Sequence, residues 1–194
     1  MKTQNKFTVQ KLAVVGLMAA MVYVATNFRI DIPTPMGKTM LHLGNVMCIL
    51  SGLLFGGPVG GLAAGIGSAF FFFFFPTFAP GFMVTFVMKF CLGFTAGAIA
   101  HSKGHFGENK KLNLIGAISG AVLYVALYVT KTFVTSYFIV GEHLEAVMSV
   151  VLVKGSVSLV NGIIAVIVSM ILATAIIPQL RSTQIFKKVA GQGQ

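Results

Sequence analysis

Acidic residues are scarce in this sequence, and charge of either sign is sparse. The chain has 194 residues with only four Asp and Glu against fourteen Lys and Arg; charged residues make up 9% and hydrophobic residues 56%. A soluble domain of this size needs far more polar surface, so the composition excludes an ordinary soluble protein. It predicts an all-α integral membrane protein with room for about six spans, and none for a separate soluble catalytic domain.

Several chemical signatures are missing as well. The sequence contains neither GxxxxGK[ST] nor HExxH, so we expect no ATP hydrolysis by the chain itself and no zinc protease site. No acid lies in the middle of an apolar segment, which argues against a proton- or sodium-coupled carboxylate relay. Cys48 and Cys91 lie in separate apolar segments, where they are typical of small buried hydrophobes. We therefore expect no catalytic residue, no metal and no cofactor, and we class the chain as a non-enzyme.

Long apolar segments divide the chain into six expected spans within a single membrane domain, residues 1–194. These spans are residues 9–28, 41–55, 59–75, 82–100, 112–140 and 146–177. The last two exceed the roughly 20 residues needed to cross a bilayer, so they must tilt, bend or protrude. Residues 29–40 contain Pro33, Pro35 and Gly37, and we expect them to form a loop.

The basic residues outside the spans fall into three clusters, and these clusters predict the orientation of the chain. Their members are Lys2, Lys6 and Lys11, then Lys103, Lys110 and Lys111, then Arg181, Lys187 and Lys188. Cytoplasmic loops carry an excess of Lys and Arg, so six spans with both termini in the cytoplasm are expected. Anionic lipid is the natural partner of such clusters, and the net charge of +10 does not indicate nucleic-acid binding.

Three further lysines, Lys89, Lys131 and Lys154, lie inside the apolar segments. A cation at bilayer depth costs from about 2.5 to more than 10 kcal/mol, so such residues usually line a water-filled or ligand-filled cavity. The alternative for Lys89 is that its ammonium group extends to the membrane interface. We expect a polar, electropositive cavity within the helix bundle, lined by the loop after the first span and by the last three spans.

Other polar residues accompany these lysines at helical spacing. Tyr128 and its neighbours form a polar stripe around Lys131, and Asn161 lies two turns after Lys154 on the same face, with Ser158 between them. Aromatic hydroxyls next to a cation suit a small ring-bearing ligand, whereas ordinary interhelical hydrogen bonding or helix capping is the alternative. The candidate substrate-binding residues are His42, Asn45, Lys89, Tyr128, Lys131, Lys154 and Asn161.

Two further features concern packing. Gly16 and Ala20 lie four residues apart in the first span, a spacing of small residues that allows another helix to approach closely. This pair is a candidate docking face for a partner subunit, and packing within the chain is the alternative. Residues 70–75 are six consecutive phenylalanines, compatible with one side facing lipid and the other lining a pocket.

Three segments resemble those of a known family: Leu41-His-Leu-Gly-Asn-Val, Leu54-Phe-Gly-Gly-Pro-Val-Gly-Gly and Gly65-Ile-Gly-Ser-Ala-Phe. Over nearly the whole chain, the sequence resembles the substrate-binding S components of energy-coupling factor (ECF) vitamin transporters. It is most similar to the branch assigned to hydroxymethylpyrimidine or vitamin B6 compounds. The chain departs from the family's usual pattern at Asn45 and around Phe71 or Phe72, where members commonly carry Asp.

The resemblance implies a high-affinity binding subunit in the cell membrane of a prokaryote. Such a subunit captures its vitamin outside the cell and topples in the membrane to deliver it. Delivery is to a transmembrane coupling subunit driven by two cytoplasmic ATPases, so that ATP is used by the partners. Pantothenate and riboflavin are alternative substrates. Two alternative functions come from other classes of protein: a self-sufficient carrier or channel for a small organic anion, and an integral-membrane enzyme.

Overall fold

The computed structural model describes residues 8–34, 37–75, 79–180, 182–183 and 189. Helices dominate the described chain, which confirms the mostly helical fold expected from the composition. The elements in chain order are α1 (Val9–Asn27), β1 (Arg29–Thr34), β2 (Gly37–His42), α2 (Gly44–Phe55), α3 (Gly57–Phe74), the 3-10 turn η1 (Ala79–Gly81), α4 (Phe82–Ala100), the 3-10 turn η2 (Ser102–Gly104), α5 (Lys110–Val134), the π-helical turn η3 (Thr135–Ile139) and α6 (Leu144–Leu180).

Local sequence signals explain where several helices begin and end. The side chains of Thr8 and Asn109 accept hydrogen bonds from backbone N–H groups in the first turns of α1 and α5, respectively. These are N-cap residues that satisfy donors without a partner inside the helix. Gly56 separates α2 from α3 with a φ of +84°, a conformation that favours glycine, and Pro58 follows in the first turn of α3.

Five of the described helices are long and apolar enough to cross a membrane: α1, α3, α4, α5 with its π-helical turn, and α6. The expected span at residues 41–55 differs, because α2 has only 12 residues and Leu41 and His42 belong to strand β2. At 1.5 Å per residue, α2 is about 18 Å long, well short of the bilayer core. Five spanning helices and one short apolar helix are therefore seen, and the count of six spans stays a prediction.

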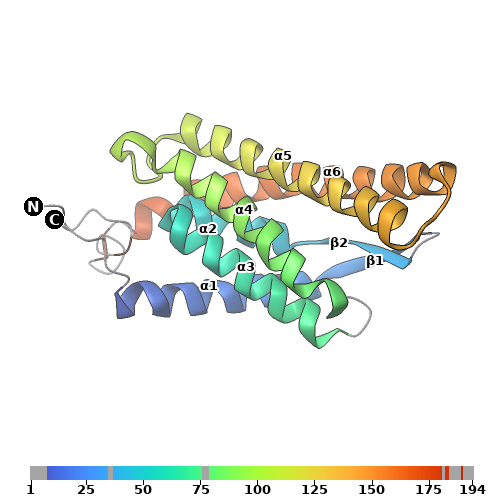
Figure 1. Ribbon diagram of the computed structural model, residues 1–194. Helices are drawn as coiled ribbons and strands as arrows, with labels where there is room; N and C mark the ends of the chain where they lie inside the picture. The colour runs from blue at the N-terminus through green and yellow to red at the C-terminus, as the bar shows by residue number, and fades with distance from the viewer. Residues whose placement is uncertain (1–7, 35–36, 76–78, 181, 184–188, 190–194) are drawn as a thin grey trace, which may run out of the picture.

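The ends of the bundle differ in what they carry (Figure 1). The start of α1, the connection from α4 to α5 and the end of α6 lie at one end, and the β-hairpin and the α5–α6 connection lie at the other. Lys11, Lys103, Lys110 and Lys111 therefore share one end, which agrees with the predicted orientation without testing it. The remaining members of the basic clusters lie outside the described residues: Lys2, Lys6, Arg181, Lys187 and Lys188.

The loop expected at residues 29–40 is wrong, because most of this segment forms an antiparallel hairpin. Strands β1 and β2 pair from Arg29 opposite His42 to Thr34 opposite Gly37. The alternation of Ile30 and Ile32 with polar residues is a strand signal that the prolines obscured. Pro33 fits in this hairpin because the sheet has only two strands, so a residue without an N–H group can face away from the partner strand.

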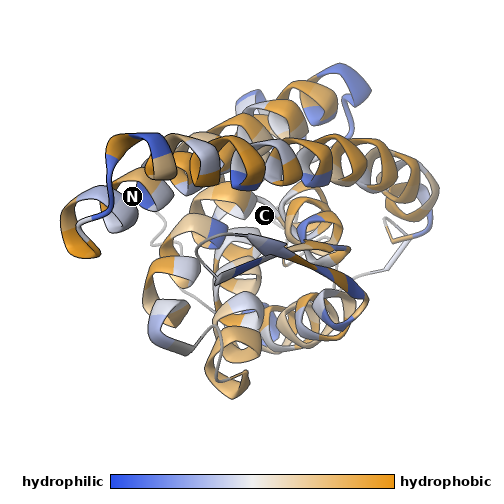
Figure 2. Cartoon of the chain, turned by 90° about the vertical axis from the view of Figure 1, so that its right-hand side faces the viewer, coloured by the Kyte–Doolittle hydropathy of each residue, from blue (hydrophilic) through white to orange (hydrophobic). Residues whose placement is uncertain are grey.

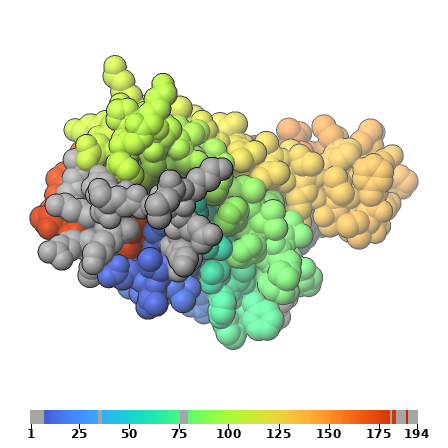
Figure 3. All heavy atoms as spheres, turned by 60° about the vertical axis from the view of Figure 1, so that its left-hand side comes forward, coloured from blue at the N-terminus to red at the C-terminus, as the bar shows by residue number. Residues whose placement is uncertain are grey.

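Apolar residues make up most of the helices, as the hydropathy colouring of Figure 2 shows, and many of them are exposed. Large side chains such as Leu17, Val122 and Ile171 are more than half exposed. In an ordinary soluble protein, such a surface would be unfavourable, whereas lipid accommodates it. The outer parts of α5 and α6 extend past α3 and α4 (Figures 1 and 3), consistent with the protruding long spans expected from the sequence.

The short helix α2 lies in the centre of the bundle and packs against α1, α3, α4 and α6. Glycines allow this close packing where α2, α3 and α4 meet. A Cβ atom added at Gly93 of α4 would lie 2.6 Å from the carbonyl oxygen of Gly60 and 3.0 Å from Cβ of Ala64, both on α3. Small residues at helix interfaces in membranes allow backbones to approach in this way.

This contact predicts opposite effects for two glycine substitutions. Gly93→Ala should lower the melting temperature of the purified protein in detergent, because the new methyl group would overlap backbone that cannot move easily. Gly16→Ala should leave it unchanged or raise it, since nothing lies within 4 Å of the added atom and alanine favours the helix by about 1 kcal/mol. Equal melting temperatures for the two variants would contradict the tight packing of α3 on α4.

Candidate functional site

A cavity of about 270 Å³ lies at the hairpin end of the bundle. Strand β2 and helices α4, α5 and α6 form its walls, together with one residue of α3 and two of η1. Its lining residues are Gly37, Lys38, Thr39, Met40, His42, Phe72, Pro80, Gly81, Thr85, Met88, Tyr124, Tyr128, Lys131, Thr132, Lys154, Ser158 and Asn161. The segment after the first span and the last three spans, which the sequence suggests as walls, all contribute to this lining.

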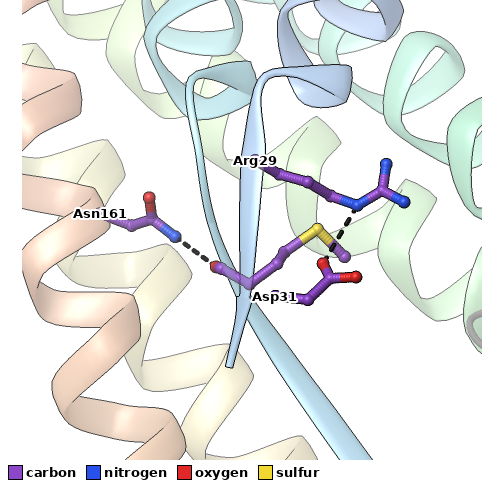
Figure 4. A network of polar contacts seen from close by, with 4 residues as sticks. Arg29, Asp31 and Asn161 are labelled. Carbon is purple, nitrogen blue, oxygen red and sulfur yellow. Dashed lines mark hydrogen bonds and ion pairs between the residues drawn. The ribbon is translucent and has the colours of Figure 1, made fainter. Parts of the chain in front are cut away.

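Asn161 joins the hairpin to α6. Its side-chain Oδ1 accepts a hydrogen bond from the backbone N–H of His42 at 3.0 Å, and its Nδ2 donates to the carbonyl oxygen of Met40 at 2.8 Å. Figure 4 shows the amide of Asn161 facing the strand from one side, with Arg29 and Asp31 on the other. The side chain of Asn161 is only 5% exposed, so water has little access to these hydrogen bonds. The amide therefore supplies partners for two backbone groups of β2 that would otherwise be buried without them.

Two tyrosines of α5 form an aromatic wall. Tyr124 and Tyr128 lie one turn apart with ring centroids 6.0 Å apart and an angle of 22° between their planes. The hydroxyl of Tyr128 shares a hydrogen bond of 3.2 Å with the hydroxyl of Thr39 on β2. This wall therefore offers a flat apolar face next to fixed hydroxyl groups, a combination that suits a ring-bearing ligand.

Lys89 lies beneath this wall rather than at the membrane interface. The side chain is 1% exposed, and its ammonium group donates a hydrogen bond to Oδ1 of Asn45 on α2. The ammonium nitrogen is also 4.0 Å from the centroid of the Tyr124 ring, within the range of a cation–π contact. Within the part of the chain that the structure describes, Nδ2 of Asn45 has no hydrogen-bond partner. Burial of Lys89 excludes the interfacial alternative.

The imidazole of His42 is neutral in this setting. Burial lowers the pKa of His42 well below its usual value, and the positive charges of Lys89 and Arg29 lower it further. Nδ1 accepts a hydrogen bond from the backbone N–H of Gly44 at 3.1 Å, so the single ring proton lies on Nε2. His42 can therefore offer an N–H donor at the cavity.

The phenylalanine run is divided between three environments. Phe71 is fully buried and stacks on Phe75 with centroids 4.5 Å apart, whereas Phe70, Phe73 and Phe74 are more than half exposed. Phe72 faces the cavity. This division matches the expectation of one side toward lipid and another toward a pocket.

Arg29 connects the other side of the hairpin to the phenylalanine run. Its guanidinium carbon is 4.8 Å from the centroid of the Phe71 ring and 4.4 Å from that of Phe75, and its Nε donates to Oδ1 of Asp31 at 3.1 Å. The hairpin is therefore held on two sides, by Asn161 of α6 and by Phe71 and Phe75 at the end of α3.

The structure brings together most of the binding residues that the sequence suggests. His42, Tyr128, Lys131, Lys154 and Asn161 line the cavity. Asn45 and Lys89 form a buried layer directly behind Tyr124. Whether these residues bind a ligand stays a prediction.

The proposed docking residues Gly16 and Ala20 lie elsewhere, on the exposed face of α1. No atom lies within 4 Å of a Cβ added at Gly16, so this position does not pack tightly inside the chain. Ala20 borders an apolar groove formed with residues of α2 and α6. The two residues are therefore accessible to lipid or to a partner helix.

Several lining residues were missed as site candidates. Lys38 and Thr39 of β2 belong to the segment expected to be a loop, and the alternation in the hairpin is the signal that places them on a strand. Tyr124 lies one helical turn from Tyr128, and Ser158 lies one turn from Lys154, on the polar faces of α5 and α6. Helical periodicity alone therefore predicts that both residues belong to the site. Phe72 and Met88 carry no chemical signal of their own.

Metal ligands do not gather in the described part of the chain. No group of three or more His, Cys, Asp and Glu residues is placed to hold an ion among the residues described. Cys48 is buried and Cys91 is partly buried, and both are free thiols. The polar groups of the cavity are instead amines, hydroxyls and amides, which bind organic ligands through hydrogen bonds and charge.

Comparison with known proteins agrees with this architecture. The sequence model of the family described as "ECF-type riboflavin transporter, S component" matches residues 6–177. The chain is similar to a solved structure described as "Structure and mechanism of the S component of a bacterial ECF transporter". The TM-score is 0.66 at 18% sequence identity, over 88% of this chain and 97% of that chain. A comparison with curated proteins gave no significant match. Because the family match extends over most of the sequence, this chain belongs to this family of ECF-type S components.

Proposed function

We propose that this S component binds a small vitamin or vitamin precursor outside the cell, either hydroxymethylpyrimidine or a vitamin B6 compound. The observation that carries the proposal is the size and chemistry of the cavity. Its volume of about 270 Å³ is slightly below the range of about 300–1,000 Å³ that is typical of sites for drug-sized ligands. A single heteroaromatic ring fits such a space on the Tyr124–Tyr128 wall. Riboflavin, with three fused rings and a sugar-alcohol chain, is less well suited.

The energy for import comes from partner subunits in this proposal. The sequence lacks a nucleotide-binding GxxxxGK[ST] motif, so two cytoplasmic ATPases and a transmembrane coupling subunit would drive transport. Gly16 and Ala20 on the exposed face of α1 are the proposed contact with the coupling subunit. The proposed topology places both termini in the cytoplasm of a prokaryote and the hairpin end outside.

A second candidate function is a self-sufficient carrier or channel for a small organic anion, and the lysines of the cavity are the observation that favours it. Uptake into liposomes that contain only this chain would support the carrier. Binding without uptake would support the subunit. Pantothenate and riboflavin remain alternative substrates for the subunit.

The most direct test identifies the ligand. The chain is purified in detergent, and mass spectrometry identifies the small molecules that copurify with it. We expect a pyrimidine or pyridine compound, bound in a ratio of one to one. Calorimetry with that compound then measures its affinity for the subunit alone. Recovery of riboflavin would contradict the proposed substrate and leave the family assignment intact.

Three substitutions test the binding residues. Lys89→Ala, Lys154→Ala and Asn161→Ala should each weaken binding of the copurified compound by about 1–3 kcal/mol, the cost of removing a hydrogen-bonding partner. Lys154 lines the cavity, Asn161 holds β2 in its wall, and Lys89 supports Tyr124. Lys111→Ala is the matched control, since it removes a lysine at the opposite end of the bundle. Unchanged affinity in all three variants, measured by calorimetry, would remove these residues from the site.

A double substitution tests the docking face. Gly16→Leu combined with Ala20→Leu should preserve vitamin binding by the solitary subunit and abolish ATP-dependent uptake by the assembled complex. Helix association in membranes depends on small residues at the contact, and both positions are exposed in the chain alone. Ala126→Leu on the exposed face of α5 is the control and should permit uptake.

Two results would contradict the docking face. Loss of binding together with expression would mean that Gly16 and Ala20 pack inside the chain. Normal uptake by the double variant would exclude both the docking and the packing roles.

A further inference from the structure

The cavity is positively charged, and the chain supplies no carboxylate to its walls. Lys38, Lys131 and Lys154 line it, and the ammonium group of Lys89 lies behind the ring of Tyr124. All four acidic residues of the chain are among those that the structure describes, and none of them lines the cavity. The formal charge of the lining is therefore +3, before Lys89 is counted.

The four acidic residues lie outside the lining of the cavity. Asp31 forms an ion pair with Arg29, with 3.1 Å between Nε and Oδ1. Glu108 precedes α5 at the opposite end of the bundle. Glu142 and Glu145 belong to the α5–α6 connection and the first turn of α6, and neither lines the cavity. No acidic side chain thus lines the space that Lys38, Lys131 and Lys154 share.

Lys131 and Lys154 are partly buried, and both face the cavity. Partly buried charges interact more strongly than fully exposed ones, so these two ammonium groups repel each other more than they would on an open surface. An anion bound between them removes that repulsion and forms charge-assisted hydrogen bonds, which are stronger than neutral ones.

A neutral hydrogen-bonding group lies next to the charged ones. Ser158 is 4% exposed and lines the cavity one helical turn after Lys154. Its hydroxyl has no hydrogen-bond partner within the described residues. Buried hydroxyls are normally hydrogen-bonded, so this one is a candidate hydrogen-bonding group for a ligand in the cavity.

We infer that the ligand of this cavity carries an anionic group, a carboxylate or a phosphate ester, bound between Lys131 and Lys154 and hydrogen-bonded to Ser158. The rest of the ligand lies against the tyrosine wall. The inference rests on the proposed function as a vitamin-binding subunit and narrows its substrate class. Among B6 and pyrimidine compounds it selects phosphorylated or carboxylated members over neutral alcohols, and among the alternatives it favours pantothenate over riboflavin.

Matched pairs of probes test the charge directly. Calorimetry on the purified subunit in a non-ionic detergent compares pyridoxine 5′-phosphate with pyridoxine, and pantothenate with its uncharged alcohol pantothenol. The first pair tests a phosphate ester and the second a carboxylate. At least one anion should bind at least about tenfold more tightly than its neutral counterpart, as expected for charge-assisted hydrogen bonds to two lysines.

Charge-neutralising variants assign the effect to the lysines. Lys131→Gln and Lys154→Gln should each reduce the preference for the anion by about tenfold or more, since they remove a charge and keep a hydrogen-bonding side chain. Lys110→Gln, at the other end of the bundle, is the control and should preserve the preference. A preference that persists in both cavity variants would overturn the assignment to Lys131 and Lys154.

The remaining outcomes separate this inference from the proposed function. If at least one compound binds and neither anion binds more tightly than its neutral counterpart, the inference is overturned and vitamin binding stands. If none of the four compounds binds, the copurified molecule decides: an anion supports the inference, and a neutral or cationic molecule overturns it. Absence of both probe binding and any copurified molecule would overturn the inference together with the proposed function.

Discussion

The cavity of this S component depends on one buried amide. Asn161 satisfies both a donor and an acceptor of the β2 backbone, and it does so from a helix 119 to 121 residues further along the chain. A strand at the edge of a two-stranded sheet leaves such groups without partners in the sheet, and hydrocarbon cannot supply them. The amide therefore allows non-helical backbone to lie against the bundle and form one wall of the cavity.

Close packing of α2, α3 and α4 is a second feature on which the site depends. The glycines of α2, α3 and α4 allow these helices to meet along their backbones, so the short helix α2 occupies the centre of the bundle. Lys89 on α4 then reaches Asn45 on α2 beneath the tyrosines of α5. A cation and an amide thus form a buried polar layer, which orients Tyr124 and supports the aromatic wall.

Five of the six expected spans and the positions of most polar candidates could be predicted from the sequence, whereas the short helix α2 and the hairpin could not. Apolar segments of about 20 residues predict membrane helices by length alone, and Lys154, Ser158 and Asn161 share a face through helical spacing. Residues 29–40 contain prolines and few apolar residues, so their weak alternation suggested a loop. The pairing of β1 with β2 and the support from α6 and α3 determine their conformation, and these contacts are not local.

The sequence by itself determined that this protein spans a membrane, where its helices lie, and that its interior carries lysines that need a polar environment. These properties follow from hydropathy and charge, which are set by the residues of each segment and do not depend on contacts with other segments. Only the tertiary structure decided that Lys38, Lys131 and Lys154 face one cavity, that Lys89 lies behind it and that no acid lines it. The rotation of each helix about its axis depends on contacts with helices distant in sequence, and that rotation selects which side chains meet.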